Sequence, residues 1–176
     1  MNIRKILVTG GARSGKSEFA ENLCLNIPGK RTYLATAIPF DDKMKQRIKL
    51  HKKRRDPNLW HNLIEEPYNI PEILVSLNSK IDVLLLDCIT IWLNNLFLKI
   101  GTDESIIFKE IEKFLKVLQG INYNIVIVSN EVGMGLVPEN KLARIFRDIS
   151  GKVNKKMAKI VSEFYIIFSG YALRLK

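Results

Sequence analysis

Apolar residues occur along this chain in two patterns, as short continuous runs and as stretches with an apolar residue at every third or fourth position. The runs predict buried strands in the following segments: residues 3–8, 31–35, 81–86, 124–129 and 164–168. Residues 173–176 predict a further strand at a sheet edge. The run that ends at Leu86 is typical of a strand that is buried on both faces of a parallel sheet.

The helical spacing falls between these runs. It predicts amphipathic helices at residues 19–27, from 41 through the basic segment that follows, and at 89–97, 107–118 and 142–161. The last of these helices has an apolar stripe formed by Leu142, Ile145, Phe146, Ile149, Val153, Met157, Ile160 and Val161. Because strands and helices alternate, we expect one α/β three-layer domain over residues 1–176, with a mostly parallel sheet.

Length and composition limit the class of protein. The 176 residues suit a single domain, and no apolar run reaches the eighteen residues of a membrane span. We find no leader peptide or low-complexity segment, so we expect a cytoplasmic protein. Cys24 and Cys88 each lie in an apolar stretch, which favours buried thiols over a disulfide or a metal site.

A glycine-rich segment directly follows the first predicted strand and precedes the first predicted helix. It fits the pattern G-x-x-x-x-G-K-[ST] and consists of Gly10, Gly11, Ala12, Arg13, Ser14, Gly15, Lys16 and Ser17. In a P-loop of this kind, backbone N–H groups surround phosphates, the lysine reaches the outer phosphates and the serine hydroxyl binds magnesium. The segment therefore predicts a P-loop NTPase-like nucleotide site, and the alternative is a tight strand-to-helix turn without a ligand.

Other polar or small residues follow the later strands. Ala35, Thr36 and Ala37 follow the second strand, Asp87 follows the third, and the polar loop 130–135 follows the fourth. Ligands of open α/β sheets bind outside the carboxyl ends of the strands, so we expect these segments to lie beside the P-loop. Asp87 is the candidate acid for Mg²⁺ together with Ser17. Its alternative role, the N-cap of the next helix, need not exclude this one.

The positive charge of the chain is concentrated in one segment. The chain has 28 basic and 18 acidic residues, a net charge of +10. Eight of the basic residues and no acid lie between Lys43 and Arg55. The segment favours a local anion-binding surface, while a solvated helix face and a nucleic-acid site are the alternatives. No aromatic residues are interleaved with these charges, which argues against nucleic acid.

One histidine of the basic segment shares a helix face with two apolar residues, since Met44, Ile48 and His51 are spaced i, i+4, i+7. A neutral imidazole is a competent nucleophile toward phosphorus, and neighbouring cations stabilise the charge that develops there. On the residues alone, however, an ordinary surface or half-buried histidine is the commoner case. The other histidine, His61, is a weaker candidate for a functional role.

Several segments together resemble the bifunctional adenosylcobinamide kinase/adenosylcobinamide-phosphate guanylyltransferase family of cobalamin biosynthesis. They are the P-loop after Ile-Leu-Val-Thr, residues 33–37, 42–48 with His51, 85–90, 130–135 with 137–140, and 144–154. The resemblance runs almost from end to end, and the stretch Asn-Glu-Val-Gly-Met-Gly with Val-Pro-Glu-Asn after it is more specific than the P-loop.

The resemblance implies two reactions. A nucleoside triphosphate, GTP or ATP, phosphorylates the hydroxyl of the aminopropanol arm of adenosylcobinamide. A histidine then attacks the α-phosphate of GTP, pyrophosphate leaves, and the bound GMP passes to the new phosphate to give adenosylcobinamide-GDP. It also implies small-molecule partners, no nucleic acid, and assembly as a trimer.

The resemblance also assigns roles to residues. His51 lies where the family has its guanylylated histidine, and because Leu50 precedes it, only His51 can serve. Lys52, Lys53, Arg54 and Arg55 match the nucleotide-contacting segment that follows. Glu65 matches an acid that contacts guanine or ribose, with Glu66 as its alternative because one extra residue precedes it. Asp87 stands where the family commonly has glutamate.

Two other hypotheses stay open from the sequence. One is a P-loop kinase of another small hydroxylated substrate, in which His51 is inert. The other is a nucleotide-dependent binding module that uses the basic helix on RNA or DNA, with steeply salt-dependent binding.

Overall fold

The computed structural model describes residues 3–39, 41–54 and 59–176, and within this part the side chains of residues 43, 47 and 51–54 are not described. It contains a seven-stranded sheet with the order β3-β2-β4-β5-β1-β6-β7. The strands are β1 (Lys5–Gly10), β2 (Arg31–Ala35), β3 (Asn62–Glu65), β4 (Val83–Asp87), β5 (Asn124–Val128), β6 (Glu163–Phe168) and β7 (Tyr171–Arg174). All pairings in the described part are parallel except that of β6 with β7.

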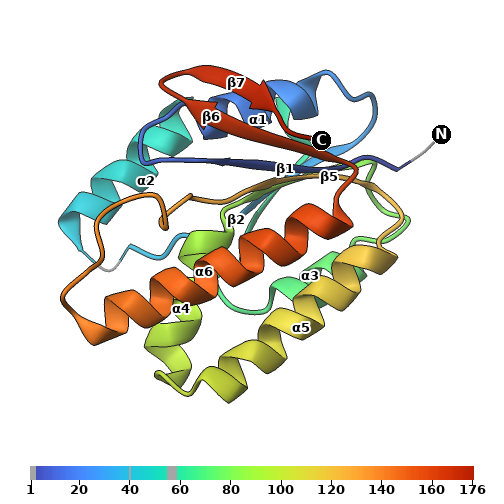
Figure 1. Ribbon diagram of the computed structural model, residues 1–176. Helices are drawn as coiled ribbons and strands as arrows, with labels where there is room; N and C mark the ends of the chain where they lie inside the picture. The colour runs from blue at the N-terminus through green and yellow to red at the C-terminus, as the bar shows by residue number, and fades with distance from the viewer. Residues whose placement is uncertain (1–2, 40, 55–58) are drawn as a thin grey trace.

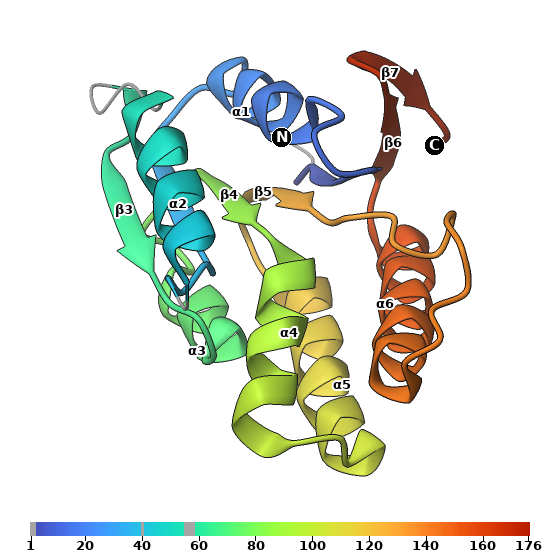
Figure 2. The same ribbon diagram turned by 90° about the vertical axis from the view of Figure 1, so that its left-hand side faces the viewer.

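Helices cover both faces of the sheet (Figures 1 and 2). They are α1 (Lys16–Leu25), α2 (Asp42–Arg54), α3 (Ile70–Ser76), α4 (Ile89–Ile100), α5 (Glu104–Gly120) and α6 (Lys141–Ile160). Figure 2 shows α1 above the sheet and α3 to α6 below it, and in Figure 1 α2 lies at the end toward which the parallel strands point. The α/β three-layer fold with a mostly parallel sheet is therefore confirmed.

Two apolar cores fill the space between sheet and helices. The larger core joins the sheet to α3, α4, α5 and α6 around residues such as Trp92 and Phe114, which are fully buried. The smaller core joins the sheet to α1 through Ala20 and Cys24. Both cysteines are buried and free, as predicted, and burial raises the pKa of Cys24.

The apolar pattern missed two short elements and misplaced one residue. The segment of β3 was noted for its two glutamates but not as a strand, because this edge strand has only one half-buried side chain and so no clear alternation. The seven-residue α3, with a proline in its first turn, is too short for a helical period to stand out. Leu142, predicted in the core stripe of α6, is exposed because it lies in the first turn of the helix, beyond the sheet.

The sequence predicts no membrane-spanning segment. None of the helices in the described part of the chain combines the length and the hydropathy that a membrane crossing requires.

A hydrogen-bonded ion pair connects the first strand region to β6. The guanidinium of Arg4 donates to both carboxylate oxygens of Glu163, at 2.6 and 2.9 Å, and the hydroxyl of Tyr165 also donates to Glu163, at 3.0 Å. Glu163 is 8% exposed. The hydrogen bond from Arg4 lowers the pKa of Glu163 although burial opposes it.

This ion pair predicts a pH dependence of stability. Because folding lowers the pKa of Glu163, its contribution is complete above the ordinary glutamate pKa and is lost as the pH falls through the lower folded value. Between pH 7 and pH 3 we expect the wild type to lose about 1 kcal/mol more free energy of unfolding, measured in urea, than Glu163→Gln. The exposed Glu139→Gln is the control and should follow the wild type. Equal losses in the wild type and Glu163→Gln would contradict the prediction.

Candidate active site

The P-loop connects β1 to α1 and is held by close backbone contacts. A Cβ on Gly10 would lie 2.6 Å from the carbonyl oxygen of Ile167 and 2.7 Å from the hydroxyl of Ser14. Gly15 is the N-cap of α1 with φ 94°, a left-handed conformation that glycine adopts without strain. These two glycines let the loop turn tightly onto β6 and then enter the helix.

Polar groups of the loop gather at the N-terminus of α1. Lys16 is 6% exposed and its Nζ donates to the carbonyl oxygen of Gly11 at 2.7 Å. The hydroxyl of Ser14 is buried and has no hydrogen-bond partner among the described residues. A buried hydroxyl, a lysine and the N-terminal end of a helix together suit an anion, because each supplies a donor or positive charge.

Parallel pairing places two carboxylates on the same sheet face. Ala35 of β2 lies opposite Asp87 of β4 on one side and opposite Glu65 of β3 on the other. Residues that lie opposite each other in neighbouring strands share a face, and each strand spacing is about 4.8 Å, so the two acidic residues lie roughly 10 Å apart along the edge.

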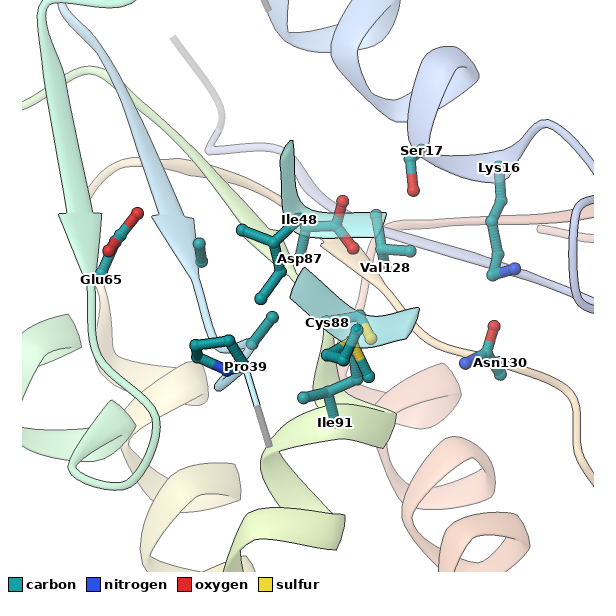
Figure 3. A pocket seen from close by; sticks show the side chains of 13 residues that line it. Lys16, Ser17, Pro39, Ile48, Glu65, Asp87, Cys88, Ile91, Val128 and Asn130 are labelled. Atoms are coloured by element: carbon teal, nitrogen blue, oxygen red, sulfur yellow. The ribbon is translucent and has the colours of Figure 1, made fainter. Parts of the chain in front are cut away.

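A pocket of about 140 Å³ opens at this edge, between the P-loop, the strand ends and α2. Figure 3 shows the hydroxyl of Ser17 and the carboxylate of Asp87 pointing into the same space, with Glu65 at the opposite end. The lining residues are Lys16, Ser17, Ala35, Ala37, Pro39, Met44, Ile48, Glu65, Asp87, Cys88, Ile91, Val128 and Asn130. The pocket is therefore polar where the P-loop meets Asp87 and largely apolar along α2 and α4.

Asp87 is oriented by a buried tyrosine. The hydroxyl of Tyr33, which is fully buried, donates to Oδ2 of Asp87 at 2.8 Å. The ring of Tyr33 is itself packed edge-on against Trp60, with the centroids 5.1 Å apart. The N-cap of α4 is Cys88, so Asp87 does not have the capping position that was its alternative role.

The two adjacent glutamates point to different surroundings. Glu65 lines the pocket, whereas the carboxylate of Glu66 accepts hydrogen bonds from the backbone N–H groups of Tyr68 and Asn69 at 2.8 and 2.9 Å. Burial would raise the pKa of Glu66, but these bonds outweigh it and the pKa is lowered. Geometry thus favours Glu65 for a contact with a ligand, and Glu66 shapes the turn before α3.

Helix α2 forms one wall of the pocket with its apolar face. Met44 and Ile48 both line the pocket, in agreement with their shared helical face. His51 is on the same helix, one turn beyond Ile48, but its side chain and those of Lys52, Lys53 and Arg54 lie outside the described side chains. Arg55 lies outside the described residues. Of the described cations on α2, Lys45 pairs with Asp42 at 3.0 Å on the surface.

Not every predicted site residue reaches the pocket. Thr36 is fully buried, and its hydroxyl donates to the carbonyl oxygen of Cys88 at 2.8 Å and accepts from the N–H of Cys88 at 2.9 Å. It therefore links the ends of β2 and β4 behind the pocket. Gly11, Ala12 and Arg13 are exposed in the P-loop. His61 accepts a hydrogen bond from the backbone N–H of Arg31, which is a structural role at the sheet edge.

Sequence reasoning missed two polar residues of the site. Tyr33 lies in a strand whose apolar pattern gave no sign that its hydroxyl contacts Asp87. Asn130 lies in the polar loop that was expected at this edge, but nothing in the sequence separated it from the other residues of that loop. Figure 3 shows its carboxamide pointing toward the end of Lys16.

The donor set fits a magnesium ion that binds together with phosphates. Among the described residues no group of three or more His, Cys, Asp or Glu side chains could hold a metal ion. Ser17 and Asp87 nevertheless supply two oxygen donors to one pocket. Magnesium commonly takes only one or two protein ligands and completes its sphere with phosphates and water, so two such donors suffice.

A family model and three curated relatives all point to the same family of enzymes. The family model for cobinamide kinase / cobinamide phosphate guanyltransferase matches residues 6–175. The bifunctional adenosylcobalamin biosynthesis protein CobU of Escherichia coli is 38% identical over 97% of this chain and 99% of its own length. CobU of Salmonella typhimurium is 39% identical over the same shares, and CobP of Pseudomonas aeruginosa is 37% identical over 97% of this chain and 96% of its own length.

Solved structures share the fold at low sequence identity. An ATPase from the type III secretion system of pathogenic bacteria has a TM-score of 0.57 at 12% identity, and the match covers 94% of this chain and 51% of that one. A protein of Pyrococcus horikoshii has a TM-score of 0.53 at 8% identity and covers 98% of this chain and 86% of that one. These likenesses show a P-loop NTPase-like fold.

The contacts of Gly10 predict which loop glycine is sterically essential. Gly10→Ala should weaken nucleotide binding at least about tenfold, because a Cβ would collide with the backbone of Ile167 and force the loop to shift. At Gly11 a Cβ meets nothing within 4 Å, so Gly11→Ala should weaken binding much less. Isothermal titration with GTP compares the two variants, and an equal loss in both would contradict the steric argument.

Proposed function

Because the chain belongs to the cobinamide kinase / cobinamide phosphate guanyltransferase family, we propose that the pocket beside the P-loop serves both reactions of this bifunctional enzyme of adenosylcobalamin biosynthesis. The observation that carries the proposal is the position of α2. Met44 and Ile48 of this helix line a pocket that is also lined by Lys16 and Ser17 of the P-loop. A triphosphate held by the P-loop would thus meet the helix that carries the candidate nucleophile.

In the kinase step, the P-loop holds the triphosphate and the hydroxyl of adenosylcobinamide attacks the γ-phosphate of GTP or ATP. An oxygen–phosphorus bond forms while the bond to the β,γ-bridging oxygen breaks, GDP or ADP leaves with the electron pair, and the hydroxyl loses its proton. The backbone N–H groups at the start of α1 bind the phosphates, and Lys16 neutralises the charge that develops as the bond to the γ-phosphate breaks. The N–H groups and Lys16 form no covalent bond with the phosphates in this step, so their contribution is electrostatic and positional.

In the guanylyltransferase step, a ring nitrogen of His51 attacks the α-phosphate of GTP. A bond forms between nitrogen and phosphorus while the bond to the bridging oxygen breaks, and pyrophosphate leaves with the electron pair. The GMP held on His51 then passes to the phosphate oxygen of adenosylcobinamide phosphate, which frees the histidine. Support comes from helical spacing, since His51 follows Ile48 by three positions and so shares its face.

The cations next to His51 have a role in the same step. Lys52, Lys53, Arg54 and Arg55 follow it directly and would attract the triphosphate and stabilise the departing pyrophosphate. Glu65, at the far end of the pocket, would accept hydrogen bonds from the base or ribose of the nucleotide.

Magnesium, bound by Ser17 and Asp87, would neutralise the phosphate oxygens and keep them in position. Asp87 is shorter by one methylene than the glutamate common in the family, and the hydrogen bond from Tyr33 fixes the direction of its carboxylate. The other oxygen of Asp87 is then available for a metal ion or its water.

The location and assembly of the enzyme are further parts of the proposal. We expect a cytoplasmic trimer. An assembled form would explain why apolar side chains of the loop before α6 are highly exposed in one chain, with Leu136 95%, Met134 68% and Val137 66% exposed.

The two other hypotheses predict different contacts. A kinase in which His51 is inert gives no reason for α2 to close the nucleotide pocket with its apolar face. A nucleic-acid module would use a wide surface with exposed aromatic side chains, whereas the described pocket is small and lined by Pro39, Met44 and Ile48 on this side.

A covalent adduct tests the proposal. After incubation with GTP and Mg²⁺, the wild type should gain the mass of one GMP through an acid-labile, base-stable bond, as measured by intact-protein mass spectrometry. His51→Ala should gain none, because the attacking nitrogen is absent. His61→Ala is the matched control and should be labelled like the wild type. Labelling that persists in His51→Ala would refute the assignment of the nucleophile.

The magnesium site makes a separate prediction. The Mg²⁺ concentration for half-maximal binding of a non-cleavable GTP analogue should rise at least about tenfold in Asp87→Asn, because a charged ligand becomes neutral. Tyr33→Phe should raise it by a smaller factor, since the carboxylate stays but loses its orienting bond. Glu66→Gln, outside the pocket, should not change it. An unaltered Mg²⁺ requirement in Asp87→Asn would exclude this metal site.

A further inference from the structure

Asn130 follows β5, the strand that lies between the strand of the P-loop and the strand of Asp87. The sheet order β4-β5-β1 places the end of β5 between the ends of the other two. The side chain of Asn130 lines the pocket together with Lys16 and Asp87. It therefore borders the space between the lysine that reaches the outer phosphates and the acid on the metal side.

The backbone of Asn130 is held on both sides by buried side chains. Its N–H donates to the hydroxyl of Thr90 at 2.7 Å, and its carbonyl oxygen accepts from the carboxamide of Asn154 at 3.1 Å. Asn154 also accepts a hydrogen bond from the hydroxyl of Ser129, at 2.7 Å. The next residue, Glu131, donates its N–H to the carbonyl oxygen of Gly10 at 3.0 Å.

These contacts use the main chain and leave the side chain of Asn130 for the pocket. Among the residues that the structure describes, its carboxamide makes no hydrogen bond, although the main chain beside it is tied to α4, α6 and the P-loop. Figure 3 shows this carboxamide and the end of Lys16 pointing toward one another. A carboxamide on a fixed main chain that has no protein hydrogen bond to give up is suited to bind a ligand, because fewer bonds have to be ordered on binding.

We propose that Asn130 recognises the terminal phosphate of the nucleoside triphosphate by donating a hydrogen bond from its carboxamide. The inference rests on the proposed nucleotide site and adds a residue to it. The terminal phosphate has to be within reach of Lys16 and of a metal ion at Asp87. The end of β5 lies between these two, so Asn130 is placed to contact that phosphate rather than the base or the sugar.

This contact gives Asn130 a role in both reactions. In the kinase step the terminal phosphate is the transferred group, and in the guanylyltransferase step it belongs to the leaving pyrophosphate. A neutral donor beside Lys16 stabilises negative charge in either case. It also lets the pocket distinguish triphosphates from diphosphates, since a diphosphate leaves the carboxamide without its partner.

Binding of paired analogues tests the proposal without any turnover. The probes are the α,β-methylene analogues of GTP and GDP, titrated calorimetrically at fixed Mg²⁺. Asn130→Ala should weaken the triphosphate about tenfold or more and change the diphosphate less than about twofold. Asn130→Asp should weaken the triphosphate further, because a carboxylate repels the phosphate.

Two controls separate this role from a structural one. Asn62→Ala removes a carboxamide that donates to Thr32 on the edge strand, outside the pocket, and should leave both affinities unchanged. Asn130→Asp keeps the shape of the side chain and the main-chain contacts, so it gives a result even if Asn130→Ala is unstable. Equal losses for triphosphate and diphosphate, or no loss, would overturn the proposal. A missing GMP adduct on His51 would refute the guanylyl mechanism but leave this binding ratio measurable.

Discussion

The site depends on the parallel pairing of β2, β4, β5 and β1, because this pairing brings four strand ends to one edge of the sheet. Each strand delivers a different chemical group there: an alanine with little bulk, a carboxylate, a carboxamide and a phosphate-binding loop. No two of these groups are near each other in the sequence. Hydrogen bonding between the strands fixes their relative heights, so the spacing of the groups is set by the rigid core of the sheet and not by flexible loops.

Buried polar side chains behind the pocket hold the strand ends in register. Thr36 bonds to both main-chain groups of Cys88, and Asn95, fully buried in α4, donates to the carbonyl oxygens of Thr36 and Pro67. The carboxamide of Asn154 likewise donates to the carbonyl oxygen of Asn130 in the loop after β5. Burying such groups is costly unless they are bonded, so they fix one arrangement of the edge. They explain why polar residues without access to the pocket still occur beside it.

Helix α2 has an apolar face toward the pocket and many charged residues outside that face. Met44 and Ile48 attach the helix to the pocket, while the charged residues around them give the helix its net positive charge. An apolar wall would limit the access of water to phosphates bound in the pocket, and this would strengthen their interactions with Lys16 and the helix N-terminus. An apolar face toward the pocket and a high positive charge along the same helix are the two properties that the proposed role of His51 requires.

Local patterns in the sequence were enough to predict the class of fold, the P-loop, the basic helix and the position of Asp87 at the end of a strand. Periodicity, glycine placement and strand ends are local properties of the chain. The family resemblance, which rests on such local motifs, was confirmed over nearly the whole length. Tertiary structure alone decided the order of the strands, the place of Glu65 in the pocket, the bond from Tyr33 to Asp87 and the place of Asn130 between the P-loop and Asp87. The order of the strands and the bond from Tyr33 to Asp87 depend on contacts between residues far apart in the chain, such as the 54 positions between Tyr33 and Asp87. Long-range packing decides such contacts, and a pattern of apolar and polar positions does not record it.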